Sequence, residues 1–317
     1  MARYLTRRLA LSLVTLWILS MLVFAGARLL PGDVGRAMLG PFADPAAVAT
    51  LNHQLGTDRP LLVQYVDWIG DFVTGDLGQS YSYRAPVAQF LWPALLNSAK
   101  LALVAFCMVV PLGILGGVMG ALYRDRAIDR ILSVTGMVAT VVPEFVSGLV
   151  LLLIFAVWLH WFPLSATAPA DAGVLTQFYH LILPSIPLVL ILFGYIARMT
   201  RTGMIEALDA DYTRTAILKG LPRATVIRRH VLRNALLPTI SVISTQTVYL
   251  IGGLVVIEIL FRYQGIGSLI YTAANKKDFP ILQAGIMSIG VLFTIMTILA
   301  DLLYAALNPR IRFGGDG

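Results

Sequence analysis

The sequence predicts an all-α polytopic membrane protein with six transmembrane helices. The chain of 317 residues is 58% hydrophobic and 13% charged, and its mean hydropathy is +0.79, whereas soluble domains carry about 25% charged residues. Its apolar stretches are long enough to cross a hydrocarbon core of about 30 Å. Inside lipid, a spanning chain must be helical to satisfy its backbone hydrogen bonds. The composition excludes a disordered chain, a disulfide-stapled secreted domain and an ordinary soluble enzyme.

Six apolar stretches are candidate spans, and each one is long enough to cross the core at 1.5 Å per residue. They lie at residues 9–30, 98–122, 131–158, 180–200, 236–260 and 282–306. The first follows Arg7 and Arg8 and contains Ala25-Gly26-Ala27, so a cleaved signal peptide is the alternative for this stretch. Its apolar run is longer than a usual signal core of about 7–15 residues. We interpret it as a retained span.

The distribution of basic residues predicts the orientation in the membrane. Two thirds of the 24 Lys and Arg residues lie at the start of the chain, at 123–130, at 198–235 and in the tail. The 159–179 loop has none. Because Lys and Arg are enriched in cytoplasmic loops, we expect both termini, the 123–130 turn and the 198–235 segment to be cytoplasmic.

These predictions divide the chain into four parts. They are an N-terminal transmembrane helix at 1–30, an extracytoplasmic cap at 31–97, a five-helix core at 98–306 that includes a cytoplasmic segment at 203–235, and a cytoplasmic tail at 307–317. The cap contains turn-forming prolines and a run at 61–69 with helical spacing. We therefore expect small helices in the cap.

The 203–235 segment is too polar to span a membrane and too apolar for a simple solvated loop. Its pattern predicts two short helices. Gly220 ends the first, because glycine tolerates the left-handed conformation, and Pro222 suits the first turn of the second. Ala216 and Gly220 lie four residues apart and predict a spot where a partner backbone approaches closely. Such helices dock into a protein groove or lie on anionic lipid, and the pattern leaves both open.

The same segment resembles the "EAA" loop in permease subunits of ATP-binding-cassette (ABC) importers, in particular those of the dipeptide/oligopeptide/nickel permease family. The family pattern D-Y-x-R-T-A-x-x-K-G, followed by R-H-x-L-R-N-A-L-L-P, is matched from Asp211 to Gly220 and from Arg229 to Pro238. The chain departs from it at Ile217-Leu218, which replaces a more polar pair, and it has Arg-Thr-Ala for the eponymous Glu-Ala-Ala. Similar stretches lie at 29–33, 55–81, 252–273 and 301–313.

This resemblance implies the type I ABC importer architecture, with a small helical extracytoplasmic segment after the first helix. It implies a multi-pass subunit of the bacterial cytoplasmic (inner) membrane that forms half of a translocation path for a di- or oligopeptide. The implied partners are a second related permease subunit in a heterodimer, two ABC ATPase subunits and an extracytoplasmic solute-binding protein. Importers of nickel, glutathione, an opine or a sugar share this machinery and stay open as alternatives.

The resemblance also implies that the first short helix of the 203–235 segment is a coupling helix, which sits in a cleft of the ATPase subunit. The residues to which it assigns ATPase coupling are Asp211, Tyr212, Arg214, Thr215, Ala216, Lys219, Gly220, Leu221, Pro222, Arg229 and His230.

We expect no catalysis by the chain itself. It has no G-x-x-x-x-G-K-[ST] stretch to cradle phosphate, so ATP and magnesium belong to the partner ATPase subunits and no cofactor is expected here. The four histidines are scattered, and Cys107 is the single cysteine, so the sequence predicts neither a metal site nor a catalytic residue. The basic residues flank the spans instead of forming one stripe, which argues against nucleic acid.

Glu144 lies midway along the predicted third span, directly after Pro143. A carboxylate at this depth is costly unless it faces the bundle interior or a wet cavity. It is either a residue of the translocation path that meets a cationic group of the substrate or a structural carboxylate. Two other classes stay open for the whole chain. One is a gradient-driven secondary transporter, although the internal repeats typical of that class are not evident, and the other is a purely structural membrane subunit.

Overall fold

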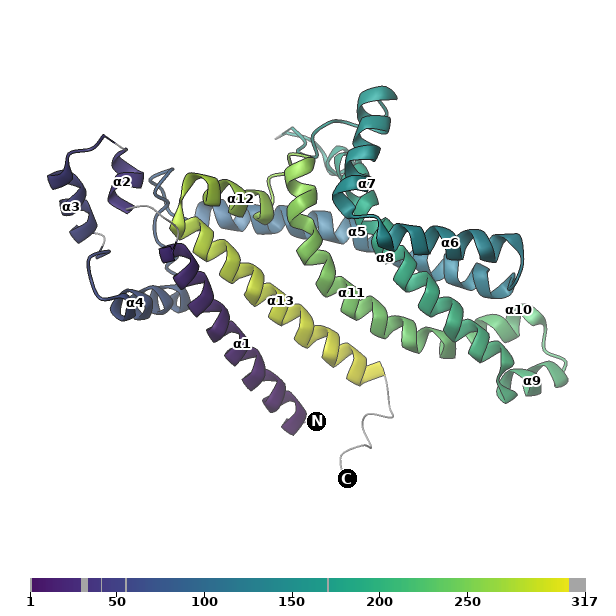
Figure 1. Ribbon diagram of the computed structural model, residues 1–317. Coiled ribbons are helices and arrows are strands. Elements are labelled where there is room, and N and C mark those ends of the chain that lie inside the picture. Colours follow the sequence, from purple (N-terminus) through teal and green to yellow (C-terminus); the bar gives the residue numbers. More distant parts are fainter. Residues whose placement is uncertain (1, 30–33, 41, 55, 170, 308–317) are drawn as a thin grey trace. The chain divides into compact units, whose positions relative to one another are not determined.

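The computed structural model describes residues 2–29, 34–40, 42–54, 56–169 and 171–307 (Figure 1). These residues form helices and their connections, with an antiparallel bridge between Gln79 and Pro86. The predicted all-α class is therefore confirmed. The motif at 29–33 lies almost entirely outside the described residues, and the basic tail at 308–317 lies wholly outside them.

The chain divides into two compact units. The first comprises Met1–Ser98 and Gln264–Thr294, and the second comprises Ala99–Tyr263 and Ile295–Gly317. The helices of the first unit are α1 (Ala2–Leu29), α2 (Val34–Leu39), α3 (Pro45–Gln54), α4 (Leu61–Thr74) and α12 (Ile266–Lys276), together with the first parts of α5 (Ala88–Leu122) and α13 (Phe279–Leu307). Small helices after the first span were expected, and α2, α3 and α4 confirm them.

Aromatic packing joins α4 to α1. The ring of Phe24 on α1 lies 5.5 Å from that of Tyr65 and 5.9 Å from that of Trp68, both on α4. The hydroxyls of Ser20 and Tyr65 share a hydrogen bond of 2.7 Å. These contacts cover part of one face of α4, on which Tyr65 and Trp68 are half-buried. The apolar residues of α4 recur at the helical spacing visible in the sequence.

A buried carboxylate holds the connection before α5. Asp278, 1% exposed, accepts hydrogen bonds from the Ser80 hydroxyl at 2.5 Å and from the backbone amides of Tyr81 at 3.2 Å and Ser82 at 3.0 Å. Nearby, the Lys276 ammonium lies 4.6 Å above the ring of Tyr83. These bonds join two segments that lie about 200 residues apart in the chain.

The second unit contains the rest of α5 and α13, together with the helices from α6 to α11. These are α6 (Ala127–Val141), α7 (Glu144–Leu151), the π-helical stretch η1 (Leu152–Trp158), α8 (Val174–Asp209), α9 (Asp211–Leu218), α10 (Arg223–Thr225), the π-helical stretch η2 (Val226–Val231) and α11 (Leu232–Leu260). Helix α8 packs against both α6 and α11, and its buried face supplies much of the unit's hydrophobic core.

Among the residues that the structure describes, five helices are long and apolar enough to span a membrane. They cover Thr6–Ala27, Ala88–Leu122, Val174–Asp209, Arg223–Leu260 and Phe279–Leu302. Helix α8 has 36 residues, or about 54 Å at 1.5 Å per residue. It therefore extends well beyond a hydrocarbon core of about 30 Å.

The predicted third span, 131–158, is not one straight helix. Helices α6 and α7 meet at a bend of 107° and form a broken span or a re-entrant pair. Val142 and Pro143 have extended backbone at the break, with ψ of 122° and 141°. Proline disfavours helical backbone in the residue before it and has no amide hydrogen to donate. The bend is much sharper than the kink that a proline within a continuous helix gives.

The second short helix predicted in the 203–235 segment does not end before the fifth span. Residues Arg223–Leu260 form one helical run that continues through Pro238. The π-helical stretch η2 lies near its start, and such stretches absorb an irregularity without ending the helix. The break expected between the 203–235 segment and the span at 236–260 is therefore absent.

Small residues let the helices of the second unit approach closely. A Cβ on Gly117 of α5 would lie 2.5 Å from the Ala197 carbonyl oxygen of α8, and one on Gly194 of α8 would overlap the Gly136 carbonyl of α6. Close approach of this kind is typical of helix packing in membranes, where small residues line the contact.

Candidate coupling segment and translocation cavity

The 203–235 segment begins and ends at a direct contact between α8 and α11. A Cβ on Gly203 would overlap the backbone carbonyl oxygen of Ala235. The segment is therefore closed at its base, and α9, α10 and η2 lie beyond this contact at one end of the paired helices (Figure 1). The contact between Gly203 and Ala235 therefore holds α9 at the ends of two long helices, α8 and α11.

The segment has a hydrophobic core of its own. Its buried members come from α5, α8, α9, η2 and α11, and they are Ala121, Met204, Ala207, Ala216, Val226, Val231 and Ala235. Ala216 is 5% exposed, so it packs against its own chain. The open small-residue spot expected at Ala216 and Gly220 is therefore not formed as predicted, because Ala216 points inward while Gly220 stays exposed.

A buried hydroxyl fixes the start of α9. The Thr213 side chain, 1% exposed, donates a hydrogen bond of 2.6 Å to the Ala207 carbonyl on α8. Gly220 after α9 has φ of +75°, the left-handed backbone predicted for a residue that ends a helix. Sequence reasoning missed Thr213, because its hydroxyl bonds to a carbonyl six residues earlier, on the preceding helix.

The outward side of α9 carries apolar side chains. Leu218 is 81% exposed and Ile217 60% exposed, and Tyr212 and Leu221 are exposed as well. A hollow of about 430 Å³ lies beside them, between Leu208, Asp209, Arg214, Ile217 and Leu218. The predicted coupling residues Asp211, Arg214, Thr215, Lys219 and Pro222 are exposed on the same short stretch. The two predicted residues on η2 lie farther along, with Arg229 exposed and His230 half-buried.

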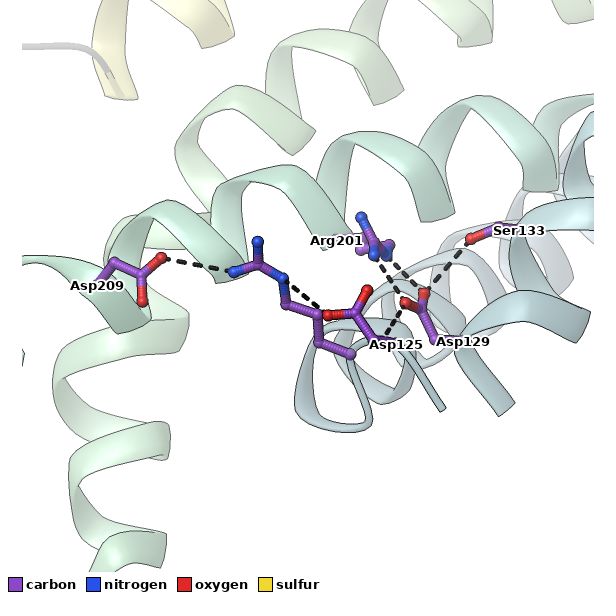
Figure 2. A network of polar contacts seen from close by, with 6 residues as sticks. Asp125, Asp129, Ser133, Arg201 and Asp209 are labelled. Carbon is purple, nitrogen blue, oxygen red and sulfur yellow. Dashed lines mark hydrogen bonds and ion pairs between the residues drawn. The ribbon is translucent and has the colours of Figure 1, made fainter. Parts of the chain in front are cut away.

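Two ion pairs join α8 to the start of α6 and to the turn before it (Figure 2). Arg201 donates to both carboxylate oxygens of Asp129, at 2.6 Å and 2.7 Å. The Asp125 amide and the Ser133 hydroxyl also donate to Asp129, at 3.0 Å and 3.4 Å. The second pair is looser and exposed, with 3.7 Å between Arg124 and Asp209. Sequence reasoning assigned these basic residues to membrane orientation and did not find their partners.

Glu144 lines a cavity of about 580 Å³ in the second unit. The other lining residues are Leu188, Ile191, Leu192 and Tyr195 of α8 and Gln246, Tyr249, Leu250, Gly252 and Gly253 of α11. The two helices that carry the 203–235 segment therefore also form this cavity. Within the described ranges, no three His, Cys, Asp or Glu side chains come together as a group that could hold a metal ion.

Comparison with known proteins decides the family. The family described as "Binding-protein-dependent transport system inner membrane component" matches residues 110–313, and its N-terminal companion matches residues 1–93. The chain belongs to this family. Its members are membrane components of ABC importers, so the resemblance seen in the 203–235 segment is confirmed. The chain is accordingly a multi-pass inner-membrane permease.

Two relatives match this ABC importer permease along its whole length. A probable peptide ABC transporter permease protein, y4tP, of Sinorhizobium fredii is 35% identical over 313 residues, which is 99% of this chain and 100% of the relative. The glutathione transport system permease protein GsiC of Escherichia coli is 35% identical over the same shares of both chains.

A solved structure supports the fold of this permease. The MetNI methionine ABC transporter, in an inward-facing conformation, aligns with a TM-score of 0.53 and 14% identity, covering 70% of this chain and 97% of the other. At this identity the likeness concerns the fold, and it confirms the predicted type I permease architecture.

Proposed function

We propose that this permease forms half of the translocation path for a di- or oligopeptide. A solute-binding protein delivers the peptide, a second related permease subunit completes the path as a heterodimer, and two ABC ATPase subunits bind ATP and magnesium. The peptide substrate is supported by one relative named as a probable peptide permease and another named as a glutathione permease, since glutathione is itself a tripeptide. Nickel, an opine or a sugar are the remaining candidates.

The observation that carries the proposal is the exposed apolar tip of α9. Leu218 and Ile217 are largely in solvent, although the segment buries six other residues in its core together with Ala121 of α5. An exposed apolar group on a firmly anchored helix is typical of a protein contact. We assign this contact to a groove of an ABC ATPase subunit, with Tyr212 and Leu221 beside the tip and Arg214 and Lys219 at its rim.

Two helices connect the ATPase contact on α9 with the Glu144 cavity. Helices α8 and α11 meet at Gly203 and Ala235 below the segment and line the Glu144 cavity farther along. When ATP closes the ATPase pair, α9 moves with it, and α8 and α11 move as rigid levers. Packed helices shift between discrete arrangements instead of deforming continuously, so displacement of α9 changes access to the cavity.

Co-purification with the ATPase pair tests the docking. Leu218→Glu places a charge at the centre of the apolar tip, and we expect loss of ATPase association with an unchanged melting temperature. Leu175→Glu is the matched control, because Leu175 lies at the other end of α8 and is 82% exposed. Normal ATPase association of Leu218→Glu contradicts the proposal. Uptake by wild-type vesicles that needs a proton or sodium gradient and no ATP favours a secondary transporter.

A further inference from the structure

Glu144 is the acidic residue of the cavity, and no residue that the structure describes neutralises it. Its carboxylate forms neither a hydrogen bond nor an ion pair with any described side chain, and it is half-buried. The lining contains no Lys, Arg or His. A carboxylate on a largely apolar wall is costly unless a cation or a proton accompanies it.

Three further polar side chains share this wall with Glu144. They are Tyr195 on α8 and Gln246 and Tyr249 on α11. Among the described residues none of them has a hydrogen-bond partner, and both tyrosines are largely exposed. Small-molecule sites combine apolar walls with a few polar groups of this kind, in cavities of about 300–1,000 Å³. The four side chains therefore have the composition of a binding site.

The break between α6 and α7 positions the carboxylate. Glu144 is the first residue of α7, where the helix dipole stabilises a negative charge. A Cβ on Gly253 of α11 would lie 3.5 Å from Glu144 Oε1, so the glycine gives the carboxylate room beside the opposite helix. Extended backbone at membrane depth is tolerated where it is buried in protein or lines a cavity.

We propose that this cavity is a transit site for solutes with a protonated amino group. Glu144 is the counter-ion for the ammonium, and Gln246, Tyr195 and Tyr249 exchange hydrogen bonds with the amides and carbonyls of the same solute. This inference rests on the proposed function and deepens it, because it names the residues on the path and the chemical class that they select.

Thiol labelling of the assembled importer tests the charge directly. The variant is Gln246→Cys in a Cys107→Ser background, with the partner subunits present. Its thiol is labelled with a cationic trimethylammonium-ethyl and an anionic sulfonatoethyl methanethiosulfonate, and mass spectrometry gives the rate at this position. A cleft of one sign raises the local concentration of counter-ions by about 10- to 1,000-fold. We expect the ratio of cationic to anionic rates to fall about tenfold or more when Glu144→Gln is added.

Glu206→Gln is the matched control for this experiment, because Glu206 is an exposed glutamate outside the cavity. It should leave the labelling ratio unchanged. An unchanged ratio in Glu144→Gln overturns the inference, since it means that the carboxylate is protonated or is already paired with a basic residue of the second permease subunit. Absence of labelling at this position also overturns it, because the cavity is then closed to solutes.

Uptake separates this inference from the proposed function. The reconstituted importer, with its binding protein, is given trialanine, whose amino group is its one positive charge. We expect Glu144→Gln to lower the initial rate about tenfold, with ATPase association unchanged. Wild-type rates in this variant overturn the transit site but leave the peptide importer intact. If the wild-type importer carries no alanine peptide at all, the proposed peptide function fails, and the labelling ratio still decides the charge of the cavity.

Discussion

Arg201 of α8 donates two parallel hydrogen bonds to Asp129 at the start of α6, from Nε to Oδ1 at 2.6 Å and from Nη2 to Oδ2 at 2.7 Å. Asp129 is almost fully buried, with a side chain 6% exposed, whereas that of Arg201 is 29% exposed. The pair lies between the α5–α6 turn and the helix that leads to the 203–235 segment (Figure 2). It therefore holds the start of α6 against α8.

The unequal burial of this pair predicts unequal effects of removing its members. Arg201→Ala leaves a buried carboxylate without its counter-charge, and we expect the free energy of unfolding in mixed micelles to fall by about 3–5 kcal/mol. Asp129→Asn leaves an arginine that can reach water, and we expect a loss of about 1–3 kcal/mol.

Arg124→Ala is the control for the ion pair, because its pair with Asp209 is long and exposed. Exposed pairs contribute less than about 1 kcal/mol, so the free energy of unfolding should barely change. Equal losses for Arg201→Ala and Arg124→Ala would show that the buried pair does not hold α6 to α8.

The contact between Gly203 and Ala235 predicts a site intolerant of even one added methyl group. Gly203→Ala forces α8 away from the Ala235 carbonyl, and overpacking of this kind costs about 1–3 kcal/mol. We expect a lower melting temperature and weaker ATPase association, because the base of the 203–235 segment is displaced. The matched control is Gly70→Ala on α4, where no atom beyond the adjacent residues and the backbone of the same helix lies within 4 Å of the added Cβ. Since alanine favours helix over glycine by up to about 1 kcal/mol, that control should be neutral or stabilising.

The sequence predicted the elements with strong local signals. The apolar spans follow from hydropathy, and the end of α9 follows from Gly220. The inward direction of the Ala216 side chain could not be predicted, because it depends on packing against Met204 and Val226 of other helices. The cavity residues Tyr195, Gln246 and Tyr249 were missed for the same reason. Each looks ordinary in its own helix, and the cavity forms only where α7, α8 and α11 meet.

The inward position of Ala216 predicts that two neighbouring residues of α9 respond differently to the same change. Ala216→Glu buries an unpaired charge in the core of the segment, which is strongly destabilising. Leu218→Glu should leave the melting temperature unchanged, since that side chain is already in solvent. Thermal unfolding of the purified permease without its ATPase subunits measures both. Similar melting temperatures for the two variants would contradict the packing described for α9.

The hydrogen bonds to the buried Asp278 should stabilise the 75–87 connection of the first unit. Asp278→Ala removes the acceptor for the Ser80 hydroxyl and for the amides of Tyr81 and Ser82. Hydrogen bonds to charged groups are worth about 1.5–3 kcal/mol each, so we expect faster proteolysis of the 75–87 connection and a lower melting temperature. Asp67→Ala is the control, since its contact with Arg59 is exposed and 3.4 Å long. Proteolysis of Asp278→Ala at the wild-type rate would show that Asp278 does not stabilise this connection.

The most direct test of the account is photo-crosslinking from the tip of α9 in the assembled importer. Leu218 is replaced by benzoylphenylalanine, and the same amino acid replaces Leu175 at the other end of α8 as the control. The account predicts a light-dependent product that joins position 218 to an ABC ATPase subunit, with none from position 175. Crosslinks from position 218 to lipid alone, with the ATPase captured from another part of the chain, would contradict it.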